Sequence, residues 1–434
     1  MNYYSASNIK ELLLSTIHSI FEQKSVLLND PDSSFSRVRK ISFEQAMLFP
    51  MLAGSENVDA ELLDFFGEDI LPLQSAMIQR RNQIKPAAFK VLFSSFTQQI
   101  LVMKTFHGYQ LITCDGSRLN LPYHPSDPET FIKCIEGRKG LNQMHMNCLY
   151  DPLNDIFIDV ELQGIQQMDE KAAFTTLLKR QADLKPKAKQ IFIADRGYAS
   201  YNIFAHAIHN NQLFLIRVPE SFARNICKNR EDWLADPCAD ETVIVNIGRR
   251  NTKEKRQLTN YHHIQSSGHY DFLEKGSDET DQLHLRVLKF PISEDNFEYI
   301  VTNIPKYTFS LSTVKELYNL RWKEETAFRH LKYAGNMVHI HSLKKDHLLQ
   351  EIYGKLTLYN FSSFIASVEG VTKKTDKYTY TFNHTQVQKI CIRYLRGTVK
   401  NVKELITRYL VPIRPGRSFE RELRRQPADT LAYR

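Results

Sequence analysis

Four side chains whose chemistry suits a phosphate recur at helical spacing between residues 318 and 332. Tyr318, Arg321, Glu325 and Lys332 are separated by three, four and seven positions. At about 100° per residue, these steps place the four side chains within roughly a 60° arc of one helix face. The pattern therefore predicts a tyrosine, two cations and a carboxylate that point into one space.

Two aspartates extend this set to three acids. Asp115 follows the apolar run 111–114, and Asp195 follows the apolar run 191–194. Short apolar runs predict buried strands, so each aspartate is expected at a strand end. Three carboxylates on two strand ends and a helix suit metal-assisted phosphoryl transfer. The alternatives are strand-end aspartates of an unrelated α/β protein and an ordinary i,i+4 surface ion pair on the helix.

These residues resemble the bacterial DDE insertion-sequence transposases that carry the YREK signature. The matching pieces are Asp115-Gly116-Ser117 with Leu121-Pro122 after it, Asp195-Arg196-Gly197-Tyr198, and the segment from Tyr318 to Lys332. The resemblance spans roughly residues 35–365. It implies an α/β fold of the α+β multidomain kind, with an RNase H-like catalytic core interrupted by a β-rich insertion. A helical N-terminal DNA-binding domain and a helical C-terminal segment would flank that core.

The resemblance implies a cut-and-paste DNA transposase, which is a Mg2+-dependent endonuclease and polynucleotidyl transferase. Asp115, Asp195 and Glu325 would be its catalytic residues and would hold two Mg2+ ions about 4 Å apart, with Mn2+ able to substitute. Water would attack first and release a 3′-OH at the element end, and that 3′-OH would then attack target DNA. A hairpin intermediate at the element ends is also implied.

Further residues are expected to contact DNA. Arg321 and Lys332 would neutralise phosphates near the cut, Tyr318 would hydrogen-bond or stack beside the 5′ phosphate, and Arg196 is another phosphate-binding candidate. In the resembled family the insertion contacts the transposon end and can hold a flipped base. Trp233 is therefore a candidate stacking residue, although a lone tryptophan is more often part of a core.

The residue before the expected catalytic glutamate departs from the family pattern, in which an apolar residue is more common. Here it is Glu324, which helical angles place with Leu317, Leu320 and Leu331 on the side expected to be buried. Glu325 is therefore expected to be the third acid. Because an unpaired buried carboxylate is costly, Glu324 should have a partner or lie at the rim of the core.

Composition agrees with a polyanionic partner. The chain has 434 residues, enough for about three domains, with 57 Lys and Arg against 49 Asp and Glu, a net charge of +8 and a pI near 9.0. No run of 18 apolar residues and no leader-like start occurs, so a cytoplasmic, nucleoid-associated protein without membrane contact is expected. The six cysteines lack CxxC spacing and read as reduced thiols. A metal site at His339 and His341 is the weaker alternative to ordinary histidines.

Five segments follow from the changing periodicity. The N-terminal part combines helical apolar spacing with basic residues, namely Arg37, Arg39, Lys40, Arg80, Arg81, Lys85 and Lys90, which suit DNA or an ordinary solvated face. The separation of Asp195 and Glu325, 325 − 195 = 130 positions, requires an inserted unit. The expected segments are a helical DNA-binding domain at 1–105, the first part of the core at 106–219, a β-rich insertion at 220–306, the second part of the core at 307–370, and a basic segment for DNA or dimer contacts at 371–434.

Two details concern segment ends. Thr313 to Glu316 has the spacing of a capping box, and Gly335 marks a helix end, so the signature helix is expected between them. The C-terminal end is rich in arginine and could track DNA or dock a second subunit. Its six arginines are Arg414, Arg417, Arg421, Arg424, Arg425 and Arg434.

The expected partners are double-stranded DNA, as terminal inverted repeats and target, and a second copy of the chain, because joining two ends requires paired protomers. Two other functions remain open. One is a catalytically inactive, transposase-derived DNA-binding regulator, which three complete acids disfavour. The other is an RNase H-like nuclease that cuts without joining.

Overall fold

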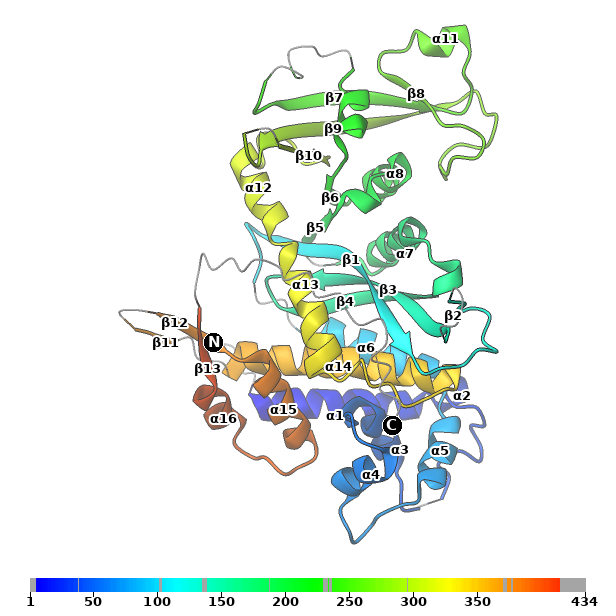
Figure 1. Cartoon of the computed structure of the whole chain (residues 1–434), viewed down its shortest axis with the longest axis vertical. Coiled ribbons are helices and arrows are strands. Elements are labelled where there is room, and N and C mark those ends of the chain that lie inside the picture. Colours follow the sequence, from blue (N-terminus) through cyan, green and yellow to red (C-terminus); the bar gives the residue numbers. More distant parts are fainter. Residues whose placement is uncertain are drawn as a thin grey trace.

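The computed structural model describes residues 5–413 apart from 38, 101–103, 135–138, 187, 229–232, 234–235, 295, 370–372 and 376–377. The six arginines expected to track DNA or dock a subunit lie outside these residues. Within them the chain has a mixed α/β fold built on one large sheet, which confirms the expected fold class (Figure 1).

Helices fill the N-terminal part of the chain. Ser5 and Ser42 each begin a helix with a capping box, in which the serine hydroxyl accepts from a backbone N–H and a side chain returns the bond. The helices are α1 (Ala6–Glu22), α2 (Lys24–Leu27), α3 (Phe43–Leu52), α4 (Val58–Phe66), α5 (Gln74–Asn82) and α6 (Pro86–Gln99).

The central sheet runs in the order β2-β3-β1-β5-β6-β10-β9-β7-β8, with β4 paired to β3. Strands β1, β5 and β6 are parallel to one another, and the other pairings are antiparallel except β7 with β8. The strands are β1 (Tyr109–Leu121), β2 (Phe131–Ile132), β3 (Leu141–Asp151), β4 (Ile156–Gly164), β5 (Lys189–Ala194), β6 (Leu213–Arg217), β7 (Asp240–Gly248), β8 (Tyr261–His263), β9 (Thr280–Pro291) and β10 (Phe297–Thr302).

Strand β5 shows why the centre of this sheet is stable. Ile191 and Ile193 lie in one hydrophobic core, whereas Phe192 and Ala194 lie in another, on the opposite face. A strand covered on both faces reads as a continuous apolar run rather than an alternating one. The two strands that precede the aspartates are therefore buried, as their sequences predicted.

The strands expected to form an insertion domain extend the same sheet. β10 pairs with β6, and β9 and β7 follow outward, so the region 220–306 adds an edge to the core sheet rather than closing a sheet of its own. Figure 1 shows these strands at the far end of the molecule from the N-terminal helices. The insertion is β-rich as expected, but its strands are continuous with the core.

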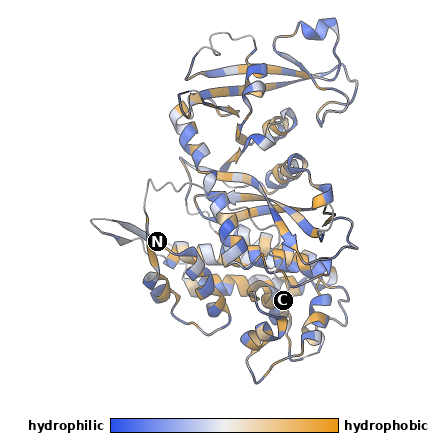
Figure 2. Cartoon of the chain, in the orientation of Figure 1, coloured by the Kyte–Doolittle hydropathy of each residue, from blue (hydrophilic) through white to orange (hydrophobic). Residues whose placement is uncertain are grey.

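Helices cover both faces of the sheet. On one face, α7 and α8 pack against β5 and β6, where the rings of Phe204 and Phe214 stack with centroids 4.9 Å apart. Figure 2 shows hydrophobic residues along the strands and packed helices, whereas the outlying α11 is hydrophilic. These elements are η1 (Ile165–Gln167), α7 (Glu170–Asp183), η2 (Arg196–Tyr198), α8 (Tyr201–His209), α9 (Glu220–Ile226) and α11 (Lys253–Arg256).

The signature segment is not one straight helix, which corrects the expectation of a continuous helix face. It consists of α12 (Leu311–Asn319), α13 (Trp322–Arg329) and a π-helical turn η3 (His330–Ala334) that ends at Gly335. The N-cap is Ser310, three residues before Thr313, because the hydroxyl of Ser310 accepts from the backbone N–H of Thr313. The break at residues 320–321 and the wider π-helical turn change the angles between the four signature side chains.

The second half of the core supplies a long buried helix, α14 (Lys345–Glu369), whose residues 347–366 are almost all buried. A helix buried on every side belongs in the interior. It packs on α6 and α3, and one hydrophobic core joins the N-terminal helices, α14 and the sheet. The N-terminal helices therefore share this core instead of enclosing their own. The remaining elements are α15 (His384–Leu395), α16 (Val402–Arg408) and the small sheet β11 (Lys373–Lys374), β12 (Thr379–Phe382) and β13 (Leu410–Ile413).

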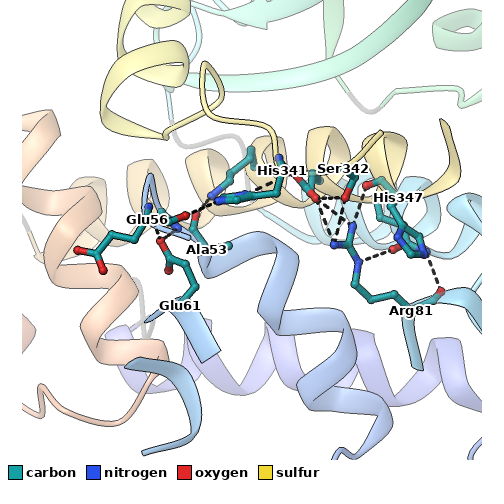
Figure 3. Close-up of polar contacts among 11 residues, drawn as sticks. Ala53, Glu56, Glu61, Arg81, His341, Ser342 and His347 are labelled. Atoms are coloured by element: carbon teal, nitrogen blue, oxygen red, sulfur yellow. Dashed lines mark hydrogen bonds and ion pairs between the residues drawn. The ribbon is translucent and has the colours of Figure 1, made fainter. Parts of the chain in front are cut away.

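A buried ion pair fastens α5 to α14. The guanidinium of Arg81 lies 3.1 Å from Glu351 and also donates to Gln350 and to the backbone carbonyl of His347 (Figure 3). Ser342 donates to the same carboxylate, which ties down the chain that follows the signature helix. Arg81, like the buried Arg80, is therefore unavailable to DNA phosphates in this conformation, which corrects its place among the expected DNA contacts.

No helix in the described ranges is both long and apolar enough to span a bilayer. The six cysteines are all free thiols, and four of them are buried.

Candidate active site

The two aspartates meet because β1 and β5 are parallel neighbours. Cys114 and Ala194 are partners in the strand register, so Asp115 and Asp195 are the next residues on adjacent strands. The carboxyl ends of parallel strands are where α/β proteins gather polar side chains, since the strands there open into a crevice. The structure therefore brings together these two predicted site residues.

Asp115 is held in a partly desolvated position. Its Oδ1 accepts from the backbone N–H of Gly116 at 2.8 Å, and about a quarter of the side chain is exposed. The pKa of Asp115 is raised to about 6, chiefly by burial and also by the charges of Asp195 and Glu325, against the opposing effects of the Gly116 hydrogen bond and Arg321. The electrostatic coupling places all three predicted acids within range of one another.

Asp195 is fixed by the turn that follows it. Its Oδ1 accepts from the backbone N–H of Gly197 at 2.8 Å, which makes it the N-cap of η2. The same turn leaves Arg196 exposed to solvent and buries Tyr198 in the core below. A short polar cap thus orients the second carboxylate without a further side chain.

Arg321 lies between the acids. One guanidinium nitrogen, Nη1, is 3.8 Å from Asp115 Oδ2 and 3.7 Å from Glu325 Oε1. The side chain is 7% exposed, so these contacts are made in a medium where charge interacts strongly. Its position at the α12–α13 junction lets it reach β1 and α13 at once. The arginine neutralises part of the charge that three neighbouring carboxylates create.

Glu325 and Glu324 take opposite environments, as the helical angles predicted. The side chain of Glu325 is about a third exposed and faces Arg321. Glu324 has no exposed surface, and its carboxylate oxygens make no well-formed hydrogen bond within the described residues. Burial and the charge of Asp115 raise the pKa of Glu324 well above its usual value, which favours its protonated form. Glu324 therefore lies inside the core rather than at its rim, where it was also expected.

The other signature residues surround this centre unequally. Tyr318 is buried, and its ring lies 5.8 Å from the guanidinium of Arg321, so it supports that side chain. Lys332, on η3, is partly buried, and burial lowers its pKa. The positive charge of Lys332 acts to lower the pKa of the Cys148 thiol, against the burial that raises it. Cys148 is the cross-strand partner of Asp115.

Trp233 does not have the exposure that a stacking residue requires. Its side chain is 3% exposed and packs in the core beside Tyr299, with ring centroids 6.0 Å apart, and Lys289 lies over the indole. In this conformation no face of the indole is open to a base. Trp233 is therefore a core residue, which was the alternative interpretation, and its position does not support a stacking role.

The three acids can be compared with the ligands that a pair of divalent cations needs. Within the described ranges no three His, Cys, Asp or Glu side chains are gathered tightly enough to hold one ion together. Mg2+ seldom requires such a cage, because it keeps several waters and takes one or two carboxylates plus substrate phosphates. Three mutually repelling carboxylates, one with a raised pKa, fit that mode of binding. Asp115, Asp195 and Glu325 are the residues that would hold the ions.

Sequence reasoning did not single out a polar group beneath the aspartates. His145 and Asn147 are buried on the same face of β3, and His145 Nε2 lies 3.1 Å from Glu170 Oε1 at the start of α7. Polar residues at period two inside an otherwise apolar strand were the available signal. Glu170 is ordinary by sequence, because nothing local reveals that the fold brings it to this place.

Comparison with known proteins agrees with the site. The family described as "Transposase DDE domain" matches residues 107–361, which is more than half of the chain and includes all three acids. A solved structure described as a piggyBac transposase synaptic complex with hairpin DNA is 10% identical and aligns with a TM-score of 0.44. The alignment covers 96% of this chain and 87% of that chain. No curated protein matches the sequence.

Proposed function

Because the chain belongs to the DDE transposase family, we propose that it excises an insertion sequence by cut-and-paste transposition. In this proposal it cuts DNA at the terminal inverted repeats and joins the released 3′-OH ends to target DNA. The observation that carries the proposal is the adjacency of Asp115, which lies inside β1 rather than at its end, and Asp195, which directly follows the parallel strand β5, with Arg321 in contact with Asp115 and Glu325. The YREK pattern supports a bacterial element of the insertion-sequence type and a hairpin intermediate.

Two bound Mg2+ ions would supply activation of the attacking oxygen and stabilisation of the leaving oxygen in an in-line displacement. The chain's own residues prepare the site for that chemistry. The cap at Gly197 and the backbone N–H of Gly116 fix the directions of the two aspartates. Arg321 contacts Asp115 and Glu325 in this structure. It can give up part of this contact and bind a DNA phosphate instead, because a guanidinium can donate to two oxygens at once.

DNA is the proposed partner. The net charge of +8 supports binding to a polyanion, and two of the expected phosphate contacts are the exposed Arg196, next to Asp195, and the partly buried Lys332. A homodimer is proposed for the complex that pairs two element ends, since one site cannot hold both. The cytoplasm, at the nucleoid, is the proposed location.

The decisive experiment measures metal-dependent cleavage and joining of a labelled duplex that carries the element's own terminal repeat. Wild type and Glu325→Gln are compared in Mg2+, with Glu324→Gln as the matched control one residue away. Nicked and joined products from wild type and Glu324→Gln, but not from Glu325→Gln, are expected. Cleavage that survives in Glu325→Gln would remove this residue from the site.

The two alternatives give different products in the same assay. A nuclease without joining activity leaves free 3′-OH ends and no joined strand. A regulator derived from a transposase binds the terminal repeat and leaves it intact. Either pattern from the wild type would overturn the proposed function.

A further inference from the structure

A chain of hydrogen bonds links three elements beneath the two aspartates. His145 Nε2 lies 3.1 Å from Glu170 Oε1, His145 Nδ1 lies 3.0 Å from the amide nitrogen of Asn147, and the hydroxyl of Tyr198 donates to Asn147 Oδ1 at 2.8 Å. These residues belong to α7, β3 and η2, and η2 is the turn that Asp195 caps. The chain therefore runs from the start of α7 to the second catalytic turn.

One assignment of hydrogens satisfies every member. If Nε2 of His145 carries the proton, it donates to Glu170 while Nδ1 accepts from the amide of Asn147, whose oxygen then accepts from Tyr198. The histidine is 3% exposed, so a mismatched donor or acceptor here would be costly. A fully satisfied buried network of this kind holds its members in a single arrangement.

The strand that carries Asp115 is in contact with the same group. Gly116, the next residue on β1, is the cross-strand partner of Asn147, and the His145 ring covers the space where a side chain at this position would lie. A Cβ added at Gly116 would be 2.7 Å from His145 Nε2 and 2.8 Å from Glu170 Oε1. Glycine is therefore required beside Asp115, and the backbone of β1 rests directly on the histidine and the glutamate.

The other carboxylate oxygen of Glu170 faces the second turn. A Cβ added at Gly197 would lie 3.8 Å from Glu170 Oε2, which is ordinary contact distance. The carboxylate of Glu170 thus lies between Gly116 and Gly197, the glycines that follow Asp115 and Asp195. Glu170 therefore contacts both the β1 backbone beside Asp115 and the η2 turn that Asp195 caps, so it can fix one relative to the other.

We propose that Glu170 is a positioning residue of the active site: held by His145, its carboxylate sets the placement of Asp115 on β1 relative to the turn that Asp195 caps. It also adds a fourth negative charge to the side of the space where divalent cations are expected. Its place at the first turn of α7, where the helix end is positive, helps to keep that charge there. The inference rests on the proposed function for the metal-binding role of the aspartates.

Three variants isolate this role. Glu170→Gln keeps the shape and removes the charge, and His145→Gln removes the imidazole that holds Glu170. The matched control is Asp169→Asn, which removes a charge one residue away and keeps the N-cap, because the asparagine oxygen can still accept from Ala172.

The first measurement is the affinity for Mn2+ of the full chain bound to terminal-repeat DNA, monitored by electron paramagnetic resonance. Thermal melting of each variant is measured in parallel. The second is the Mg2+ dependence of single-turnover cleavage. Partners of metal ligands typically contribute 10- to 100-fold to affinity or activity. A weakening of about that size is expected for Glu170→Gln and His145→Gln, with unchanged melting, and a double variant no weaker than the singles.

Several outcomes would overturn the inference. These are wild-type Mn2+ affinity and cleavage in Glu170→Gln, a loss matched by Asp169→Asn, or a loss that follows a lowered melting temperature. Failure of the proposed function looks different, because the wild type itself would then neither bind Mn2+ nor cut.

Discussion

Glu324 and Glu325 are adjacent in the chain, but Glu324 has no exposed surface whereas Glu325 is about a third exposed and lies 3.7 Å from Arg321. Glutamine has the same shape as a protonated glutamate, the form that burial of Glu324 favours. Glu324→Gln is therefore expected to fold at pH 7 with stability equal to or above wild type and to keep cleavage within a few-fold of wild type. Urea unfolding and the strand-cleavage assay check both parts, and a complete loss of cleavage would assign Glu324 to the metal site.

Substitution of Asp115 or Asp195 is expected to abolish DNA cleavage rather than DNA binding. Asp115→Asn and Asp195→Asn should abolish strand cleavage while end-binding stays largely intact, because each removes a metal-binding charge and little surface for DNA. Gel-shift binding in Ca2+ and cleavage in Mg2+ separate the two properties. Cleavage retained in either variant would exclude that residue from the site.

Arg81 is expected to matter for stability. Breaking a buried ion pair by removing one partner typically costs about 3–5 kcal/mol, because the other charge stays buried. Arg81→Met should lower the free energy of unfolding by about this amount, and Arg81→Met with Glu351→Leu should lose less than the sum of the single changes. The control is Lys345→Ala, which breaks an exposed pair with Glu129 and is expected to cost under about 1 kcal/mol. Equal losses in Arg81→Met and Lys345→Ala would contradict the buried network.

Three partly buried histidines predict sensitivity to acid. Burial lowers the pKa of His262, His330 and His347 to about 4 each. The unfolded chain then binds more protons than the folded chain between pH 6.5 and 4, so stability is lost as the pH falls through this window. Urea unfolding at pH 7.5, 5.5 and 4.5 measures the slope, which should be shallower in His330→Gln and unchanged in the exposed control His18→Gln. A slope that His330→Gln leaves unaltered would contradict the prediction.

Trp233 is expected to act through packing. Trp233→Ala should destabilise the protein by about 3–5 kcal/mol, as large-to-small changes in a core do. Trp233→Phe should keep wild-type cleavage per folded molecule, because phenylalanine fills most of the same space. Thermal melting and cleavage of the terminal-repeat duplex test the pair. A selective cleavage defect in a well-folded Trp233→Phe protein would restore a role at the DNA.

Local patterns predicted those parts of the fold that local forces determine. The apolar runs before Asp115 and Asp195 became neighbouring strands, and the amphipathic segment 201–209 became α8 with the expected ends. The opposite faces of Glu324 and Glu325 also followed from helical angles, because both lie in one unbroken helix, α13. Periodicity is sufficient wherever burial of one face decides the structure.

Features that depend on distant partners were not predictable in this way. The pairing of β6 with β10 and the burial of Arg81 by Glu351 join residues far apart in the sequence. The break before Trp322 and the π-helical turn interrupt a helical pattern that is continuous in sequence. Glu170 reached the site through the same long-range assembly.

The continuity of the sheet also has a consequence for the order of events during synthesis. Strand β6 ends at Arg217, but its partner β10 begins only at Phe297, 297 − 217 = 80 positions later. At roughly 5–20 residues per second, the ribosome leaves that edge unpaired for about 4–16 s, with the risk of wrong pairing that open edges carry. Glu325 emerges after β10, so the growing chain carries two acids long before the third. A partly made chain therefore lacks the third acid of the candidate site until after the sheet has been closed.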